Sequence, residues 1–290
     1  MKHTICAILA IAGLLTATNT NAQDAAKDGA EKKKKTSLVI STNGISIESA
    51  DSAGKATQAD KKWTSHVNFD LGVILMQDNT NYNDPSVKSY LNVPANKQNV
   101  NLLQLTGKSM NVNIYPFMRS YRALKTAGQR IYITSGLGMQ IYNLRYENNI
   151  TYTRNPATVT EDTISFKKDK LGIDYLNVPL MFTFKTRISN HPTNHKKDRW
   201  LVYGAGITAG WNWSTWAKQK SDERGKVKVH DNWNFSKTND FGIAGFNSCI
   251  TAEIGLDNLF KLYGSYQVTS LYNNGIEQHP VCIGIRFSGI

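Results

Sequence analysis

The sequence predicts an all-β protein: an eight-stranded antiparallel up-and-down transmembrane β-barrel with long extracellular loops and short periplasmic turns. Three observations predict it. From residue 63 onward, segments of about ten residues alternate between apolar and polar side chains. The polar faces of these segments carry glycine and medium-sized polar residues, which suit a narrow interior. The connections between the segments alternate between long and short.

The first 22 residues have the pattern of an export signal. Lys2 and His3 precede the apolar run ICAILAIAGLL, and small residues follow it. Thr20 and Ala22 occupy the −3 and −1 positions of a predicted cleavage site. Residues 1–22 are therefore predicted to be a secretory signal peptide, and the rest of the chain is expected to leave the cytoplasm.

Residues 23–62 are polar, rich in lysine and poor in aromatics, which is typical of a chain that cannot bury a core. We expect a periplasmic segment that is mostly disordered. Two alternating runs flank Asn43 and Gly44, and Asn-Gly is the strongest two-residue hairpin signal. Because a lone hairpin is marginal in water, this predicts local order only.

The barrel is predicted over residues 63–290, with eight strands that each have an apolar and a polar face. In order, they are HVNFDLGVIL (66–75), SMNVNIYPFM (109–118), RIYITSGLGMQIY (130–142), DYLNVPLMFTFKT (174–186), WLVYGAGITAGWNWS (200–214), FNSCITAEIGL (246–256), KLYGSYQVTSL (261–271) and VCIGIRFSGI (281–290). Pro116 and Pro179 interrupt the second and the fourth. Because a closed barrel has no edge strand to shelter a proline, each predicts a bulge or a break in pairing.

Alternating strands fit either a membrane barrel with apolar side chains outside or a soluble barrel with apolar side chains inside. Aromatics near strand ends, notably Trp211, Trp213 and Trp216, favour the membrane form because they resemble an interfacial girdle. Connections are long after the first, third and fifth strands and short after the second, fourth and sixth. Long outside and short inside is the outer-membrane pattern, and it places both termini in the periplasm.

The segment DYLNVPLMFTFK resembles the YLEIPLLLK segment typical of the PorT-like outer-membrane β-barrel proteins of the Bacteroidota. LVYGAGITAGW and the terminal CIGIRF are similar to the same group. The resemblance covers about residues 63–290. The chain departs from the family in running past Phe287 to Ile290, whereas members often end at an aromatic that the assembly machinery recognises.

This resemblance implies an accessory role in protein secretion or envelope assembly. The implied partners are outer-membrane lipid, proteins of the envelope or the secretion machinery, and the barrel-assembly machinery during insertion. We expect a monomer. We also expect no nucleic-acid binding, because the lysines and arginines behind the net charge of +12 gather in linkers and turns.

Histidine and carboxylate positions argue against a chemical site. His191 and His195 are four residues apart, but the intervening proline opposes a helix that would present both to one metal ion. Ser65 and His66 have no obvious carboxylate partner. We therefore predict no catalytic, cofactor-binding or metal-binding residues, and no cofactor.

By strand parity, Asp70, Glu253 and Arg286 point into the barrel, and we interpret them as an interior salt-bridge network rather than a catalytic site. Cys249 and Cys282 also point inward, on the sixth and eighth strands. Because a strand lies between them, their backbones would be about 10 Å apart. That is too far for a disulfide, so two free thiols are expected.

The sequence thus predicts a non-catalytic outer-membrane barrel with a structural, binding or secretion and envelope-accessory role. General porin activity is not expected, because eight strands enclose only enough space for side chains. An additional strand extension within TISFKKDKLGI (163–173) would raise the count toward ten. Two alternatives stay open: an outer-membrane lipid A-modifying enzyme and a secreted soluble lipocalin-like β-barrel.

Overall fold

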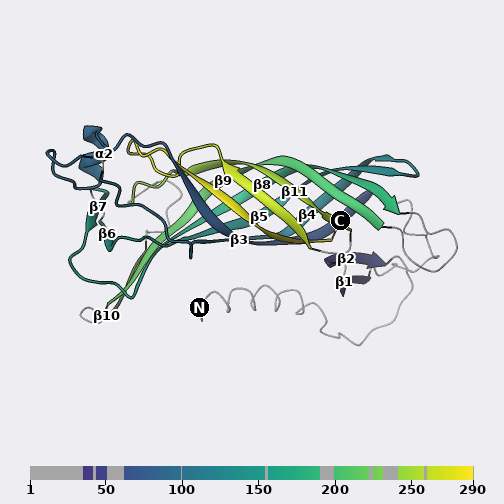
Figure 1. Cartoon of the computed structure of the whole chain (residues 1–290). Coiled ribbons are helices and arrows are strands. Elements are labelled where there is room, and N and C mark those ends of the chain that lie inside the picture. The colour runs from purple at the N-terminus through teal and green to yellow at the C-terminus, as the bar shows by residue number, and fades with distance from the viewer. Residues whose placement is uncertain are drawn as a thin grey trace, which may run out of the picture. The chain divides into compact units, whose positions relative to one another are not determined.

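The computed structural model describes residues 35–41, 44–50, 62–98, 100–153, 156–189, 199–221, 225–230, 241–257 and 260–289 (Figure 1). The predicted signal peptide, most of residues 23–62, and His191 and His195 lie outside these ranges. No helix in the described parts of the chain is long and apolar enough to cross a membrane.

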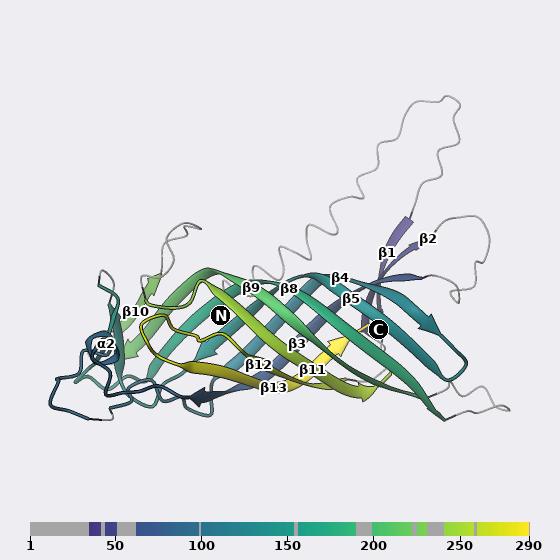
Figure 2. The same cartoon turned by 90° about the horizontal axis from the view of Figure 1, so that it is seen from above.

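Eight antiparallel strands form a closed ring, and each pairs with its neighbour in the sequence (Figures 1 and 2). They are β3 (Trp63–Asp78), β4 (Met110–Lys125), β5 (Gln129–Leu144), β8 (Lys168–Ser189), β9 (Arg199–Ser221), β11 (Phe246–Leu256), β12 (Lys261–Gln267) and β13 (Gln278–Ser288). β3 pairs with β4 on one side and with β13 on the other, so the first and last strands of the ring close it. This confirms the predicted eight-stranded up-and-down barrel.

Among the described residues, five further strands and one helix lie off the ring. They are β1 (Lys35–Ser41), β2 (Gly44–Ala50), α2 (Pro85–Tyr90), β6 (Ile150–Thr153), β7 (Thr158–Glu161) and β10 (Gly225–His230). β1 neighbours β2, and β2 pairs with β3 through Ser46 and His66. The two strands flank Asn43, as the Asn-Gly signal predicts. Asn43 itself lies outside the described residues.

The connections alternate in length around the ring. Residues 79–109, 145–167, 222–245 and 268–277 join strands at one end, here called the long-loop end. Residues 126–128, 190–198 and 257–260 join them at the other, the short-turn end. The segment 163–173 does not add a strand to the ring, because its second half is the beginning of β8 at Lys168.

The outer face of the ring is apolar and the inner face is polar. The exposed large apolar side chains on the strands form the apolar belt, which includes Leu71, Val73, Leu75, Phe117, Leu137, Val178, Leu180, Phe182, Ile207, Trp211, Ile250, Ile254, Leu262, Ile283, Ile285 and Phe287. The buried side chains between them are largely Asn, Gln, Ser, Thr and charged residues. A soluble barrel needs the opposite polarity, because its interior must hold the apolar core.

Both prolines disturb pairing as predicted. Pro116 lies at a register shift between β4 and β5, from Ile114 to Phe117. Pro179 stays in register with Thr208 of β9, while its pairing with β5 is interrupted for two residues on each strand. Each proline lacks the N–H that a ladder needs, so the sheet skips that position without opening the ring.

Candidate functional site

Three charged side chains from distant strands meet inside the barrel. Asp70 on β3 lies opposite Arg286 on β13. Arg286 donates to both oxygens of Asp70, with Nε at 2.7 Å from Oδ1 and Nη2 at 2.8 Å from Oδ2. Its Nη1 reaches Glu253 Oε2 across the lumen at 3.0 Å, and Asn113 donates to Asp70 at 3.0 Å. All of these side chains are buried, which confirms the predicted salt-bridge network.

A tyrosine crosses the interior above two glycines. Tyr263, Gly284, Gly72 and Asn111 are cross-strand neighbours in one row over β12, β13, β3 and β4. Tyr263 Oη donates to Asn111 Oδ1 at 2.6 Å, so its ring must lie across the strands between. A Cβ on Gly72 would lie 2.6 Å from that hydroxyl, closer than real contacts allow. Glycine is required there because any side chain would occupy the space of the ring.

Two buried lysines continue the polar interior toward the short-turn end. Lys185 Nζ forms an ion pair with Asp257 Oδ1 at 3.0 Å, and Lys261 Nζ donates to Ser288 Oγ at 2.7 Å. Sequence reasoning missed both lysines as interior groups. The parity of their strands could have found them, since Lys185 shares a face with Pro179.

His66 is fully buried at the beginning of this polar interior, opposite Met118 of β4. Neither of its ring nitrogens has a hydrogen-bond partner among the described residues. The structure therefore does not bring Ser65 and His66 together with a hydrogen-bonded carboxylate, the arrangement that nucleophilic catalysis uses.

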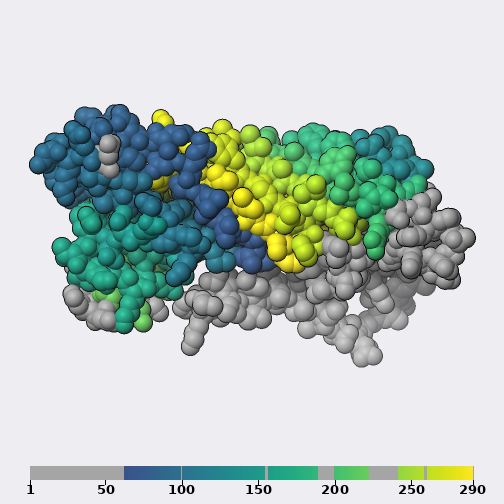
Figure 3. Space-filling model, in the orientation of Figure 1, coloured from purple at the N-terminus to yellow at the C-terminus, as the bar shows by residue number. Residues whose placement is uncertain are grey.

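The loops at the long-loop end pack into a cap with its own aromatic core. Tyr272 lies at its centre, with its hydroxyl 2.9 Å from that of Tyr146 and 3.2 Å from that of Tyr152. Tyr90 of α2 donates to the carbonyl of Phe241 at 2.6 Å. The aliphatic side chains packed around them include Val87, Leu91, Leu102, Leu103, Leu144, Ile150, Val159, Leu171, Ile173, Ile243, Leu271 and Ile276. In Figure 3, the blue and teal loops of this end form one continuous mass.

This cap was missed from the sequence because its loops read as polar segments rich in Asn and Asp. Four loops supply the core, and each contributes two to five buried apolar side chains at irregular spacing, so no single segment has a periodic pattern. The signal that was available is the recurrence of tyrosine within the loops. Buried tyrosines need a hydroxyl partner, and here they provide it to one another.

Asp169 lies where β8 leaves the barrel and enters the cap, well outside the apolar belt. Its Oδ2 accepts a hydrogen bond from the Ile150 amide at 3.1 Å, which ties β6 to β8. Burial raises the pKa of Asp169 to about 7, with a smaller contribution from the negative charge of Asp162, while hydrogen bonds from Ile150 and Gln219 oppose the rise.

We expect the contact between β6 and β8 to be more stable at pH 5 than at pH 8. The folded carboxyl keeps its proton up to a pKa of about 7, whereas the unfolded carboxyl has released it above about 4. Stability therefore falls as pH rises through this interval. The measurement is the protection factor of the Ile150 amide in hydrogen exchange. Asp169→Asn, a mimic of the protonated form, should remove the pH dependence, and an unchanged pH profile in this variant would contradict the assignment.

Asp78 organises the outer end of β3. Tyr82 donates to its Oδ2 at 2.5 Å, and Asn101 and Gln278 donate to the same oxygen at 3.1 and 2.9 Å. The Thr80 amide donates to Oδ1 at 3.0 Å. Burial opposes ionisation, but the hydrogen bonds from Tyr82, Thr80 and Gln278 outweigh it and lower the pKa of Asp78. The carboxylate therefore acts as a stable anionic junction between β3, β13 and the first long loop.

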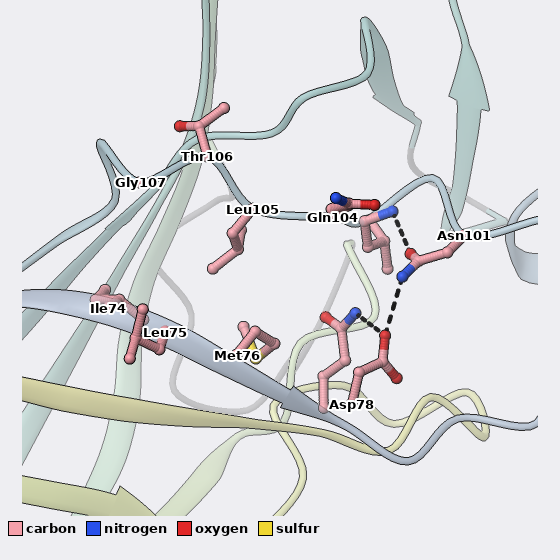
Figure 4. A pocket seen from close by; sticks show the side chains of 11 residues that line it. Ile74, Leu75, Met76, Asp78, Asn101, Gln104, Leu105, Thr106 and Gly107 are labelled. Carbon is pink, nitrogen blue, oxygen red and sulfur yellow. Dashed lines mark hydrogen bonds between the residues drawn. The ribbon is translucent and has the colours of Figure 1, made fainter.

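A pocket of about 180 Å³ lies beside this junction (Figure 4). Its apolar lining comes from Ile74, Leu75, Met76, Leu103 and Leu105. Asn101 and Asp78, joined by a hydrogen bond in Figure 4, form its polar end.

The described residues hold no group of three or more His, Cys, Asp or Glu side chains that could bind a metal ion. The histidines weighed as a metal pair, His191 and His195, lie outside those residues. Cys249 and Cys282 are both buried free thiols, as the strand order predicts.

Comparison with known proteins identifies no family. No family model matches the chain, and no curated protein matches it. Among solved structures, the chain is similar to Ail, the attachment invasion locus protein of Yersinia pestis, at 9% identity with a TM-score of 0.29. The alignment covers 79% of this chain and 99% of Ail. At these values the likeness adds nothing to what the strand pairing shows, and the resemblance to PorT-like proteins stays a prediction.

Proposed function

We propose that this chain is a monomeric outer-membrane β-barrel with a non-catalytic role, which binds partners through its cap and supports the envelope. The observation that carries the proposal is the polarity of the closed ring: an apolar belt outside, and ion pairs and amides inside. In a bilayer, a closed ring pairs the backbone of each strand on both sides over most of its length, and the belt provides the surface that lipid requires. The signal peptide predicted for residues 1–22 supplies the export that this location needs.

A binding role fits better than conduction. Arg286 spans the lumen between Asp70 and Glu253. The ring of Tyr263 also lies inside the barrel, where its hydroxyl donates to Asn111. At the long-loop end, the tyrosine core of the cap belongs to the same buried cluster as the barrel-interior side chains Tyr142, Tyr175 and Tyr263. Eight strands leave room for side chains only, so a permanently open water channel is not expected.

The cap and the N-terminal segment are the surfaces offered to partners. We place the cap outside the cell and both termini in the periplasm, because long loops outside and short turns inside are typical of such barrels. The lysine-rich residues 23–62 then face the periplasm, where an accessory role in secretion or envelope assembly would use them. The barrel-assembly machinery inserts the chain.

One set of measurements on the full chain tests this proposal. In an outer-membrane fraction, unboiled protein should migrate differently from boiled protein on a gel, because a folded barrel resists the detergent. In planar bilayers, the purified protein should give no steady conductance steps. Recovery only in the soluble periplasmic fraction, with no mobility shift, would overturn the membrane location. Regular conductance steps would overturn the non-conducting role.

A further inference from the structure

The wall of the barrel splits next to the outer end of β3. Pairing between β3 and β4 ends at Val73 and Met110, followed by one more bond from the Ile74 amide to Ser109 at 3.0 Å. On its other side, β3 stays paired with β13 as far as Asp78. Residues 75–78 therefore have a strand partner on one side only, among the residues that the structure describes.

The chain that should continue the wall has moved to a different neighbour. Residues 104–106 lie beside the segment that continues from the end of β5, and not beside β3. Leu105 bridges Tyr146, and the Thr106 amide donates to the Arg145 carbonyl at 2.8 Å. The Glu147 amide donates to the Gln104 carbonyl at 2.9 Å. The seam between β3 and β4 thus divides into two branches, and the pocket of Figure 4 lies between them.

The pocket lies at the unpaired edge of β3. Ile74 points inward and is 2% exposed, while Leu75 belongs to the apolar belt and is 54% exposed, yet both line the pocket. A pocket lined from both faces of one strand must lie in the plane of the sheet. Its outer-face lining is continuous with the belt through Leu71, Val73 and Leu75. Its far end is closed by Asp78 with Asn101 and Gln278.

We propose that this split seam binds one acyl chain of a membrane lipid, which enters sideways from the apolar belt. The inference rests on the proposed membrane location. The lining of Leu75, Leu103 and Leu105 suits a hydrocarbon chain, and the pocket of about 180 Å³ takes the end of such a chain.

The competing occupant is a peptide strand that would pair with the free edge of β3. A segment long enough to pair with residues 75–78 is much larger than the pocket, since it would bring four residues with their side chains. A hydrocarbon chain is narrower than a strand and needs no hydrogen bonds along its length. The continuity of the pocket lining with the apolar belt therefore favours lipid over peptide.

Photolabelling of the full chain in detergent micelles tests the proposal. The probe is a phosphatidylethanolamine with a diazirine near the end of one acyl chain. Labelling of peptides that contain residues 74–78 and 101–107 should saturate at one probe per chain as the probe concentration rises. Labelling of peptides from β9 and β11 should rise in proportion to the probe, because ordinary belt contacts have no fixed stoichiometry.

Leu105→Trp should fill the pocket and reduce the saturable labelling by about tenfold, an effect the size of losing two or more buried methylenes. Leu137→Trp is the matched control, because Leu137 lies on the apolar belt of β5 and is 42% exposed. It should leave the saturable labelling unchanged. Gly107→Leu is the second pocket variant, since Gly107 lines the pocket and a Cβ there has open space.

Labelling that never saturates, or that survives both pocket variants, would overturn the inference. The gel mobility shift of each variant keeps this outcome separate from a failure of the proposed function. A wild-type chain that shifts on heating and fractionates with the outer membrane, yet shows no saturable labelling, contradicts the lipid site alone. A wild-type chain that shows neither property contradicts the membrane location itself.

Discussion

Arg286→Met is expected to lower the free energy of unfolding by about 3–5 kcal/mol, the largest effect of any single substitution proposed for this chain. The side chain of Arg286 is the only described cation hydrogen-bonded to Asp70, and it also neutralises Glu253. Its removal leaves the buried carboxylate of Asp70 without a cationic partner and takes away one of the cations near Glu253. The measurement is a urea titration of the barrel folded into lipid vesicles, followed by tryptophan fluorescence.

Arg119→Met is the matched control, since Arg119 is exposed and stacks on Trp63 at 4.9 Å from the ring centre. We expect a change below about 1 kcal/mol there. Combining Arg286→Met with Asp70→Asn should recover much of the loss, because Asp70 is then uncharged and Glu253 stays near the positive charge of Lys261. Equal effects of Arg286→Met and Arg119→Met would show that the network does not stabilise the barrel.

Gly72→Ala is expected to lower the free energy of unfolding by about 1–3 kcal/mol, the usual effect of an overpacked core. The new methyl would lie 2.6 Å from Tyr263 Oη and 2.7 Å from the Ile283 carbonyl. Either the ring or the backbone of β13 must then move, and the hydrogen bond from Tyr263 to Asn111 weakens. The same urea titration measures the change.

Gly264→Ala provides the control, because a Cβ at Gly264 has no neighbour closer than 3.8 Å. Its effect should stay below that of Gly72→Ala. In a Tyr263→Phe background, the cost of Gly72→Ala should shrink, since the hydroxyl it collides with is gone, and a double-mutant cycle measures this coupling. Additive effects would show that the Tyr263 hydroxyl does not occupy the space above Gly72.

Alternation was enough to predict the ring because side-chain direction in a strand has a period of two. The same parity placed Asp70, Glu253 and Arg286 inside before any contact was known. It also predicted disturbed pairing at Pro116 and Pro179, which follows from the missing N–H alone.

Features that depend on packing between distant segments were beyond this reasoning. The cap core combines tyrosines from three separate loops, so its partners become visible only when the loops are folded together. The ends of β8 and β9 extend past the predicted strands because they pair with each other and with the cap beyond the apolar belt. The split beside β3 leaves no mark on composition, since it arises from a choice between two neighbouring strands.

The seam between β3 and β13 joins the two ends of the barrel sequence, and it also carries the bond between Asp70 and Arg286. Asp70 belongs to the earliest strand of the ring to be synthesised, and Arg286 to the last. Until those strands meet, Asp70 and Arg286 do not have each other as counter-ions to offset the free-energy cost of burying their charges. Closure of the ring and neutralisation of its interior are therefore one event, so a chain that stalls or is truncated before β13 retains an uncompensated charge within its wall.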